Sequence, residues 1–495
     1  MKETDSSGKY LSKSSYMAGL KCPRQLWQLI WDRDSAGPDD GMSKLIKRFG
    51  IRFGELAHSL FPGAALIKID RYKLKQAVED TRKAIADGAE VVLEAAFCHG
   101  QCRVISDVVE KLDDGSWHLT EVKSSTSVKS EHIDDLAYQK WVMEQCGYPV
   151  SRCSVIFADK EGVWPELSSI FKKEDVTEKV NRAVLDVPGN LEAMLPILDP
   201  ANPAPATVEN FSKGACWDCV FKKTVCWKDV KGFTIHHLVN KPKIPGLKKL
   251  GVLYADDIPD NYLLADSYRK NVNRVRSKAI EVDRPAIDAM LNELEYPIHF
   301  LDFETVSVAV PPFDGTHPWD KMPFQYSLHI LDADGTKTHH EYLHRDSTYP
   351  SIEMAQKLLD DVRGSGSIVV YHAAMEISVL NYLAEMMPRE SGKFNEMVDR
   401  IWDLELIFKK YYKHWKFGSQ SSIKVVLPVF CPELSYENLA IQEGGAASYE
   451  WLKLIKILEV GEEEVMASSE DLLEYCKRDT EAMVELLAAI RSVEV

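Results

Sequence analysis

The sequence predicts an α/β protein with more than one domain. Its 495 residues, 45% of them hydrophobic and 27% charged, are enough for two or three globular domains, each with its own core. Residues 90–98 and 101–125 alternate between apolar and polar positions as strands do, whereas residues 43–61 and 131–147 carry apolar residues at helical spacing. Helices and strands are therefore mixed from the first part of the chain.

Further elements of the N-terminal half follow from local signals. The stretch 14–29, SSYMAGLKCPRQLWQL, predicts a helical start with Cys22 inside it. Residues 113–115, Asp-Asp-Gly, indicate the turn of a hairpin. Gly147 indicates the end of a helix, and residues 151–158 predict the strand that follows it.

Changes in composition along the chain indicate three regions. Residues 231–295 carry short helical patterns with basic runs, and an apolar strand is predicted to begin near residue 297. We therefore expect a first domain over residues 1–230, a helical linker over 231–295 and a second α/β domain over 296–495. A stretch rich in proline and alanine, 196–210, is typical of a tether inside the first domain.

Composition also limits the class of protein. The opening MKETDSSGKYLSKSS lacks the apolar run of a secretory signal, and no run of about eighteen apolar residues predicts a membrane span. We therefore expect a cytoplasmic protein with no membrane partner. Ten cysteines in so long a chain are too few for a disulfide scaffold. The net charge of −16 disfavours nucleic acid overall, so nucleic-acid binding would need local basic surface and metal ions.

Two carboxylates and a lysine form the first candidate site. Asp107 lies on one predicted strand, and Glu121 and Lys123 lie two residues apart on the next. Residues two apart on a strand share a face, and the hairpin brings Asp107 alongside. Two carboxylates can hold a divalent cation that lowers the pKa of a bound water, and a lysine can orient that water. In isolation, E-x-K on a strand is more often a solvated face.

The neighbouring motifs resemble the PD-(D/E)xK nuclease superfamily, specifically the RecB-like branch that includes the CRISPR-associated nucleases and the AddB nuclease domain. That branch assembles one site from a G-x3-H helix, an Asp strand, an E-x-K strand and a Gln helix. This chain has the same residues in the same order: Gly54, His58, Asp107, Glu121, Lys123 and Gln139. The resemblance implies that His58, Asp107 and Glu121 bind a metal ion. It also implies that Lys123 is the catalytic lysine and that Gln139 belongs to the catalytic site, although Met143 stands where the branch often has tyrosine.

Three cysteines with the spacing C-x2-C-x6-C lie at the end of the first expected domain: Cys216, Cys219 and Cys226. A closed metal site needs a fourth ligand. His236 or His237 could complete a zinc site, Cys22 is a distant fourth thiol, and three thiols without a metal are a further alternative.

The same resemblance implies one of these alternatives. Iron-sulfur members of the RecB-like branch carry one cysteine before the first helix, often as C-P-R, and three after the nuclease core. The segment 22-CPRQLW-27 and the cysteine triplet match that arrangement. It implies a four-iron four-sulfur (4Fe-4S) cluster held by four ligands: Cys22, Cys216, Cys219 and Cys226. Its default role is structural, because closing so long a loop restrains the unfolded chain.

A second candidate site lies in the C-terminal half and comprises five residues: Asp302, Glu304, Glu376, Tyr475 and Asp479. The first two share one face of a predicted strand, the third begins a helix after a short strand, and the last two lie one turn apart on an amphipathic helix, 470–490. Four acids around a strand end suit a two-metal site, because burying them without metal would be costly.

These motifs resemble the DnaQ-like exonucleases of the DEDD class, which have a ribonuclease H-like fold. Motif one is D-x-E, motif two N-A-x-F-D and motif three Y-x3-D; here motif two is 372-HAAME-376, so Glu376 replaces aspartate. The resemblance implies that Tyr475 positions the attacking water. It implies two Mg²⁺ or Mn²⁺ ions held by four carboxylates: Asp302, Glu304, Glu376 and Asp479. With three further segments, 402–408, 422–428 and 435–448, most of the chain resembles an uncharacterised bacterial family that fuses a RecB-like nuclease to this domain.

The expected linker carries two weaker signals. Residues 243–260, with Pro245 and Gly246, resemble a degenerate helix-hairpin-helix that could hold a phosphate, although an ordinary helix pair fits as well. The basic run 269–278 could follow a phosphate backbone or form a solvated helical face.

Together these motifs predict a metal-dependent nuclease with two catalytic centres that hydrolyses DNA, at single strands or ends, in repair or in defence against foreign DNA. Two alternatives remain: a nucleic-acid-binding scaffold with one or both centres inactive, and an RNA exonuclease.

Overall fold

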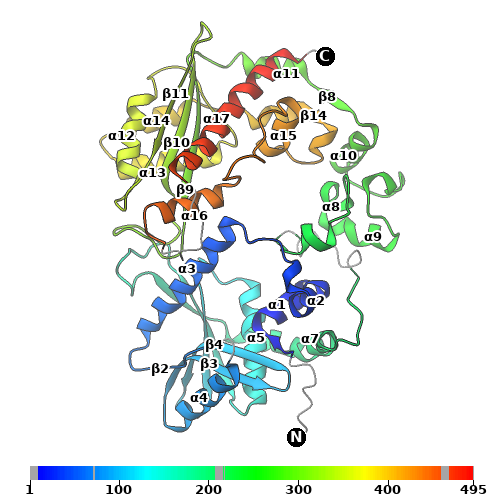
Figure 1. The fold of residues 1–495 in the computed structure, drawn as a ribbon, viewed down its shortest axis with the longest axis vertical. Helices are drawn as coiled ribbons and strands as arrows, with labels where there is room; N and C mark the ends of the chain where they lie inside the picture. The colour runs from blue at the N-terminus through cyan, green and yellow to red at the C-terminus, as the bar shows by residue number, and fades with distance from the viewer. Residues whose placement is uncertain (1–8, 71–72, 207–215, 217, 459–467, 494–495) are drawn as a thin grey trace. The chain divides into compact units, whose positions relative to one another are not determined.

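The computed structural model describes residues 9–70, 73–206, 216, 218–458 and 468–493 (Figure 1). The chain divides into two compact units, and each is described by itself. The first unit comprises Met1–Asp39, Ile46–Val230 and Val308–Trp319. The second unit comprises Asp40–Leu45, Lys231–Ser307 and Asp320–Val495. Residues 231–295, expected as a linker, therefore all belong to the second unit.

The first unit is built on a mixed sheet. Among the described residues it has seven strands in the order β2-β3-β4-β5-β6-β7, with β1 beside β4. Neighbouring strands from β3 to β5 are antiparallel, β5 and β6 are parallel, and β7 is antiparallel to β6. The strands are β1 Leu11–Ser12, β2 Ala65–Leu66, β3 Val91–His99, β4 Cys102–Lys111, β5 Trp117–Lys123, β6 Val150–Ala158 and β7 Phe171–Asp175.

Helices surround this sheet: α1 Lys13–Lys21, α2 Pro23–Trp31, α3 Gly41–Ala57, α4 Leu74–Ala86, α5 Ser130–Gln145, α6 Thr177–Ala183 and α7 Val187–Met194. Short 3₁₀ or π turns complete the unit: η1 Arg33–Ser35, η2 His58–Leu60, η3 Val184–Asp186, η4 Leu195–Leu198 and η5 Lys222–Cys226. The buried side chains of α5, among them Leu136, Val142 and Met143, join the core formed by the strands. The strands predicted at 90–98, 101–125 and 151–158 and the helices predicted at 43–61 and 131–147 are confirmed.

Cys22 corrects one prediction. It does not lie inside a helix but separates α1 from α2, with the extended angles φ −162° and ψ 120°. The reason is Pro23, whose ring excludes the helical conformation for the residue before it and which then begins α2. The side chain of Cys22 is buried.

The second unit contains another mixed sheet. Its strand order is β11-β10-β9-β12-β13, in which β9, β10 and β11 are antiparallel neighbours and β12 and β13 run parallel to β9. These strands are β9 Ile298–Val306, β10 Met322–Leu331, β11 Lys337–Leu343, β12 Ile368–Val370 and β13 Ile401–Asp403. A separate pair consists of β8 Ile280–Val282 and β14 Tyr412–His414.

The helices of the second unit are α8 Ile235–Leu238, α9 Ile244–Lys249, α10 Asp266–Ser277, α11 Arg284–Leu291, α12 Ser351–Asp361, α13 Ala374–Met386, α14 Ser391–Asp399, α15 Ile423–Phe430, α16 Gly444–Leu454 and α17 Ser469–Ser492. Its short turns are η6 Lys241–Lys243, η7 Ala255–Asp257, η8 Ile407–Tyr411 and η9 Trp415–Phe417. Helix α17, red in Figure 1, crosses β9 and β10. Helices α12, α13 and α14 contribute to a core with the sheet.

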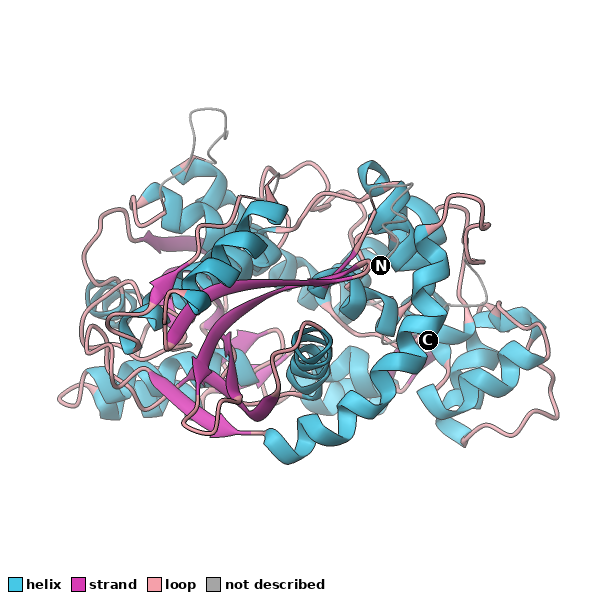
Figure 2. Ribbon diagram, turned by 90° about the horizontal axis from the view of Figure 1, so that it is seen from below, coloured by secondary structure: helices cyan, strands magenta, loops and turns pink. Residues whose placement is uncertain are grey.

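Strands in sheets with helices beside them make this a mixed α/β protein, as the sequence predicts (Figure 2). Among the described residues, no helix combines the length and the apolar character needed to cross a bilayer.

Candidate functional site: two acidic centres and a cysteine cluster

The first unit brings together the predicted residues of β4, β5 and α5. Lys123 Nζ lies 2.7 Å from Glu121 Oε1, and Gln139 Nε2 donates a hydrogen bond of 2.6 Å to Glu121 Oε2. Asp107 Oδ2 accepts a hydrogen bond of 2.6 Å from the backbone N–H of Val122. The hairpin geometry expected from the sequence therefore places Asp107 beside the E-x-K strand.

Lys13 and Asp135 also belong to this centre, and sequence reasoning missed both. Lys13 Nζ lies 2.8 Å from Glu121 Oε1, 3.8 Å from Asp107 Oδ1 and 3.9 Å from Asp135 Oδ2. Asp135 accepts hydrogen bonds from Lys123, at 2.7 Å, and from Gln139, at 2.9 Å. Asp135 lies one helical turn before Gln139, so their spacing was a usable signal. Lys13 arrives through the two-residue strand β1, which carries no periodic signal.

Burial and charge set the protonation of these groups. Burial, reinforced by the charge of Glu121, raises the pKa of Asp107 to about 7. Burial alone would also raise the pKa of Glu121, but the ammonium groups of Lys123 and Lys13 outweigh it and hold that pKa well below its usual range. The pKa values of both lysines are raised because the carboxylates outweigh the effect of burial on each ammonium. Two lysines thus compensate Glu121, whereas Asp107 is compensated only in part.

His58 approaches the centre through another residue that the sequence did not reveal, Glu94. His58 Nε2 lies 3.4 Å from Glu94 Oε1. Glu94 interrupts the pairing of β3 with β4 and has a φ of +55°, which is costly for a residue with a Cβ. Burial raises the pKa of Glu94, and the charges of Lys13 and Glu121 act on it. Glu94 is therefore an additional oxygen donor near the predicted site.

The donor set of this centre suits a divalent cation, with one constraint. Carboxylate oxygens and an imidazole are suitable ligands for Mg²⁺ or Mn²⁺. However, both oxygens of Glu121 are already engaged, one by Lys13 and Lys123 and the other by Gln139. A cation that binds Glu121 must therefore displace at least one of these donors.

Four thiols from distant parts of the first unit influence one another's ionisation: Cys22, Cys216, Cys219 and Cys226. Burial, together with the charges of Cys219, Cys22 and Cys216, raises the pKa of Cys226 to about 11. Burial also raises the pKa of Cys219, with contributions from Cys216 and Cys22. Four thiols are the number that a tetrahedral zinc site or an iron-sulfur cluster requires. Among the described residues, however, only the three acids Asp302, Glu304 and Asp479 bring their ligand atoms within 4.8 Å of one another. The alternative zinc ligands, His236 and His237, lie on α8 of the second unit.

The second unit brings three predicted acids to one point. Asp302 and Glu304 of β9 and Asp479 of α17 each offer an oxygen, and these oxygens all lie within 4.8 Å of one another. The D-x-E spacing aligns two of the acids, and the crossing of α17 over β9 brings the third.

These three carboxyl groups have little local compensation. Burial, reinforced by Asp479 and Glu304, raises the pKa of Asp302 well above its usual value. Burial also raises the pKa of Glu304 to about 8 and that of Asp479 to about 6, while Lys424 opposes both shifts. Gathering these acids is therefore unfavourable for their charged forms until a cation compensates them.

Glu376 is the fourth predicted acid and lies in the first turn of α13. It is only 3% exposed, and its Oε2 has no hydrogen-bond partner among the described residues. Burial raises its pKa to about 8, with contributions from Asp403 and Asp479. Its charge in turn acts on Asp302. Glu376 is not one of the acids whose oxygens lie within 4.8 Å of one another, but its orphaned buried carboxylate is a group that a divalent cation could satisfy.

Two tyrosines and a lysine adjoin this centre. Tyr475 of α17 is buried, and burial raises its pKa far above the usual value, so its hydroxyl keeps the proton. Tyr436 donates a hydrogen bond of 2.5 Å to Asp479 Oδ1, and its ring centroid lies 6.4 Å from that of Tyr475. Lys424 Nζ lies 5.3 Å and 5.7 Å from the centroids of Tyr436 and Tyr475. Neither Tyr436 nor Lys424, which lies on α15, was predicted to belong to this centre, although both lie in segments that the sequence analysis singled out, 422–428 and 435–448.

Asp403, at the end of β13, holds the backbone that precedes Glu376. It accepts hydrogen bonds from the N–H groups of His372, at 3.0 Å, and Ala373, at 3.3 Å. His372 has a φ of +73°, and its Nδ1 lies 2.9 Å from Glu405 Oε2. Asp403 and Glu405 therefore fix the backbone and the side chain at the start of the segment 372–376, which leads into α13.

The two weaker signals of residues 243–278 have structural explanations. Pro245 and Gly246 lie inside α9 rather than in a turn between helices, and a Cβ on Gly246 would collide with the hydroxyl of Tyr262. In the basic run, Arg274 pairs with Glu281 at 3.1 Å, and Arg276 pairs with Asp260 at 2.6 Å. These contacts leave the arginines engaged within the second unit.

Comparisons with known proteins cover parts of the chain. Residues 299–422 match the family model described as "Domain of unknown function (DUF2779)". The "Uncharacterized protein MG366 homolog" of Mycoplasma pneumoniae (strain ATCC 29342 / M129 / Subtype 1) is 27% identical over 207 residues, which make up 38% of this chain and 31% of that protein. The match thus spans less than a third of that relative. A solved structure described as "Crystal structure of SSO0001" is 13% identical, with a TM-score of 0.19, and the match covers 47% of this chain and 90% of that chain.

Proposed function

We propose that this protein is a metal-dependent nuclease with two catalytic centres, acting on single strands or ends of DNA. The observation that carries the proposal is the convergence of Asp302, Glu304 and Asp479, whose oxygens lie within 4.8 Å of one another. Such a cluster has an evident use in binding divalent cations, and two-metal centres are a common solution for phosphodiester hydrolysis.

In the second unit, four carboxylates would hold Mg²⁺ or Mn²⁺: Asp302, Glu304, Glu376 and Asp479. When bound, the ions would activate water and stabilise the leaving oxygen. Tyr475 retains its proton, so its hydroxyl can donate a hydrogen bond that orients the attacking water or a phosphate oxygen. Tyr436 fixes Asp479, and Asp403 fixes the start of the helix that carries Glu376.

In the first unit, Asp107, Glu121 and His58 would hold the cation, and Glu94 adds a donor. Lys123 keeps its charge and can stabilise the negative charge that develops on the phosphate. Gln139 fixes Glu121 and Asp135 through two hydrogen bonds. The acid, E-x-K and glutamine positions are compatible with a RecB-like nuclease site.

The cysteine cluster would stabilise the first unit rather than take part in hydrolysis. Cys22 precedes α2 and the other three thiols lie about two hundred residues later, so a 4Fe-4S cluster would link the two ends of the unit. Anaerobically purified protein should be coloured and should contain iron. Colourless protein that contains only zinc would support a zinc site instead.

The nuclease proposal is tested with end-labelled single-stranded DNA and RNA in Mn²⁺, using the full-length protein and the single variants Lys123→Ala and Asp302→Ala. We expect each variant to lose about 10³-fold or more of one activity and to retain the other. Equal activity of both variants and wild type on every substrate would contradict the two-centre proposal. If wild type degrades neither polymer, the nucleic-acid-binding scaffold becomes the better account, and preference for RNA would favour the RNA exonuclease.

A further inference from the structure

A cavity of about 620 Å³ adjoins the first acidic centre. Its polar and charged lining residues are Tyr10, Ser12, Lys13, Ser14, Arg33 and Arg103. Lys13 belongs to both sites, because it lines the cavity and its Nζ lies 2.8 Å from Glu121 Oε1. Lys13 is therefore the residue that links the cavity to the acids of the first centre.

The cavity carries positive charge although the chain as a whole carries −16. Three of its lining residues are cationic, namely Lys13, Arg33 and Arg103, and none of the described lining residues is acidic. The charge of Lys13 is balanced by the neighbouring acids, so the positive character of the cavity comes from the two arginines. The Nε of Arg103 is buried and has no hydrogen-bond partner among the described residues. A phosphate group in this cavity would gain charge-assisted hydrogen bonds from the cations. It would meet no repelling carboxylate among the described lining residues.

A second cavity of about 450 Å³ continues the first, since the two share Tyr10, Ser12, Ser14 and Arg33. Its other lining residues are Lys9, Ser15, Leu29 and Ile30. The two cavities together form the basic groove, whose described lining residues include four cations and no acid. The basic groove is thus longer than a site for one isolated phosphate.

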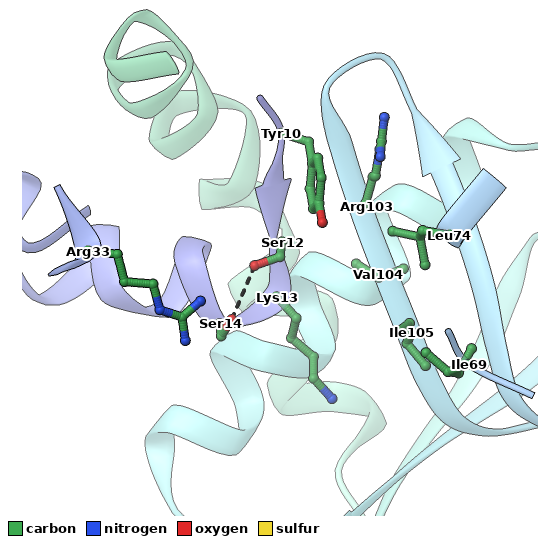
Figure 3. Close-up of a pocket in the computed structure, with 10 residues that line it drawn as sticks. All are labelled: Tyr10, Ser12, Lys13, Ser14, Arg33, Ile69, Leu74, Arg103, Val104 and Ile105. Atoms are coloured by element: carbon green, nitrogen blue, oxygen red, sulfur yellow. Dashed lines mark hydrogen bonds between the residues drawn. The ribbon is translucent and has the colours of Figure 1, made fainter. Parts of the chain in front are cut away.

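The walls of the basic groove differ in chemistry (Figure 3). Arg33 lies on one side of the hydroxyls of Ser12 and Ser14, which are 3.1 Å apart, and Tyr10 and Arg103 lie on the other. The guanidinium of Arg103 lies 4.1 Å from the centroid of the Tyr10 ring. Four apolar side chains line the far wall: Ile69, Leu74, Val104 and Ile105.

We infer that the basic groove binds a single strand of nucleic acid and leads its backbone past Lys13 to the acids of the first centre. The cations and hydroxyls would bind successive phosphates, and Tyr10 with the apolar wall would contact unpaired bases. A duplex buries the faces of its bases in stacking, so the apolar wall favours an unpaired strand. This inference deepens the proposed function, on which it rests, by assigning a strand path to one of its two centres.

The test measures binding of a fluorescein-labelled single strand of about 15 nucleotides, without added metal ions, by fluorescence anisotropy of the full-length protein. Arg33→Glu and Ser14→Glu each place an acid in the groove at an exposed position. Ser14 lies in the first turn of α1, where an acid is favourable for the helix dipole, so Ser14→Glu should not destabilise the helix. The matched control is Arg182→Glu, because Arg182 on α6 is 82% exposed and contacts Glu178 on the same helix.

Both groove variants should weaken binding about tenfold, and Arg33→Glu should reduce the slope of log Kd against log salt by about one, whereas the control should bind like wild type. Comparing single-stranded DNA with single-stranded RNA shows which polymer the groove prefers. A duplex of the same sequence should bind more weakly than either single strand. Wild-type affinity in both groove variants, preference for the duplex, or no binding by wild type would overturn the inference.

A cleavage assay with Mn²⁺ on the same preparations separates this inference from the proposed function. Cleavage by wild type together with unchanged binding and cleavage by both groove variants would overturn the groove and leave the nuclease proposal standing. Binding that the groove variants weaken, without cleavage by any preparation, would support the groove as a binding site and contradict the nuclease proposal.

Discussion

The two acidic centres differ in how their charge is compensated. In the first unit, the ammonium groups of Lys13 and Lys123 lie 2.8 Å and 2.7 Å from the same oxygen of Glu121. In the second unit, Asp302, Glu304 and Asp479 converge, and Lys424 is the nearby cation that lowers the pKa values of two of them. One centre therefore resembles a set of ion pairs, and the other a cluster of mutually repelling acids.

This difference changes what each centre requires. The first depends less on a metal ion, because Glu121 and Asp135 already have ammonium partners, and a cation that binds Glu121 must displace one of them. In the second, burial and mutual repulsion disfavour the ionised carboxylates, and a divalent cation would stabilise them. We therefore expect the second centre to bind Mn²⁺ more tightly than the first.

The largest expected effect is stabilisation of the second unit by Mn²⁺. At a free concentration of about 100 times the dissociation constant, a bound ion adds about 2.7 kcal/mol to the free energy of unfolding. For a unit of this size the transition should rise by about 5–10 °C. Differential scanning calorimetry with EDTA or Mn²⁺ measures the shift, and Asp302→Asn should abolish it. A shift of equal size in that variant would contradict a metal site at Asp302.

Removing Lys13 should destabilise the first unit. Lys13→Met leaves Glu121 buried with one ammonium partner instead of two, which should cost about 2 kcal/mol in the free energy of unfolding measured with urea. The matched change in the second unit is Lys424→Met, which should cost less than about 1 kcal/mol because Lys424 faces two tyrosine rings. Equal losses of unfolding free energy in Lys13→Met and Lys424→Met would contradict the proposed difference between the centres.

Neutralising one acid should have a larger effect in the second unit than in the first. In EDTA, Asp302→Asn should raise the free energy of unfolding by about 1 kcal/mol, because it removes the cost of burying a carboxyl group close to two others. Asp107→Asn should stabilise the first unit less, because Lys13 and Lys123 oppose the effects of burial and of Glu121 on Asp107. Stabilisation of equal size by both changes would show that the first centre is as repulsive as the second.

The smallest effect is expected for Tyr436→Phe. This change removes the hydrogen bond to Asp479 and keeps the ring, so the cost should be about 1 kcal/mol or less. Since Asp479 is then less well fixed, Mn²⁺ affinity should fall a few-fold, which titration calorimetry measures. The comparison in the first unit is Gln139→Leu, which removes the hydrogen bond that Gln139 donates to Glu121. If Tyr436→Phe binds Mn²⁺ with unchanged affinity, Tyr436 does not position Asp479 for metal binding.

The sequence predicted the parts of these centres that depend on local periodicity. Strand alternation placed Asp107 and Glu121 on neighbouring strands, and helical spacing placed Asp479 on α17. These signals are strong because each element repeats its pattern over many residues.

The missing residues depend on long-range packing. Lys13 reaches the first centre because two residues of β1 pair with β4, and Glu94 points there from an irregular position with positive φ. Tyr436 and Lys424 come from segments whose place is set by tertiary contacts. A short strand or an irregular loop carries too few residues to show a period.

The most direct test of the difference between the centres is calorimetric titration of EDTA-treated protein with Mn²⁺. Wild type, Asp302→Asn and Asp107→Asn are compared under the same buffer and salt. We predict that Asp302→Asn loses the tightest binding and that Asp107→Asn retains it. Tight Mn²⁺ binding that survives in Asp302→Asn and is lost in Asp107→Asn would contradict the account.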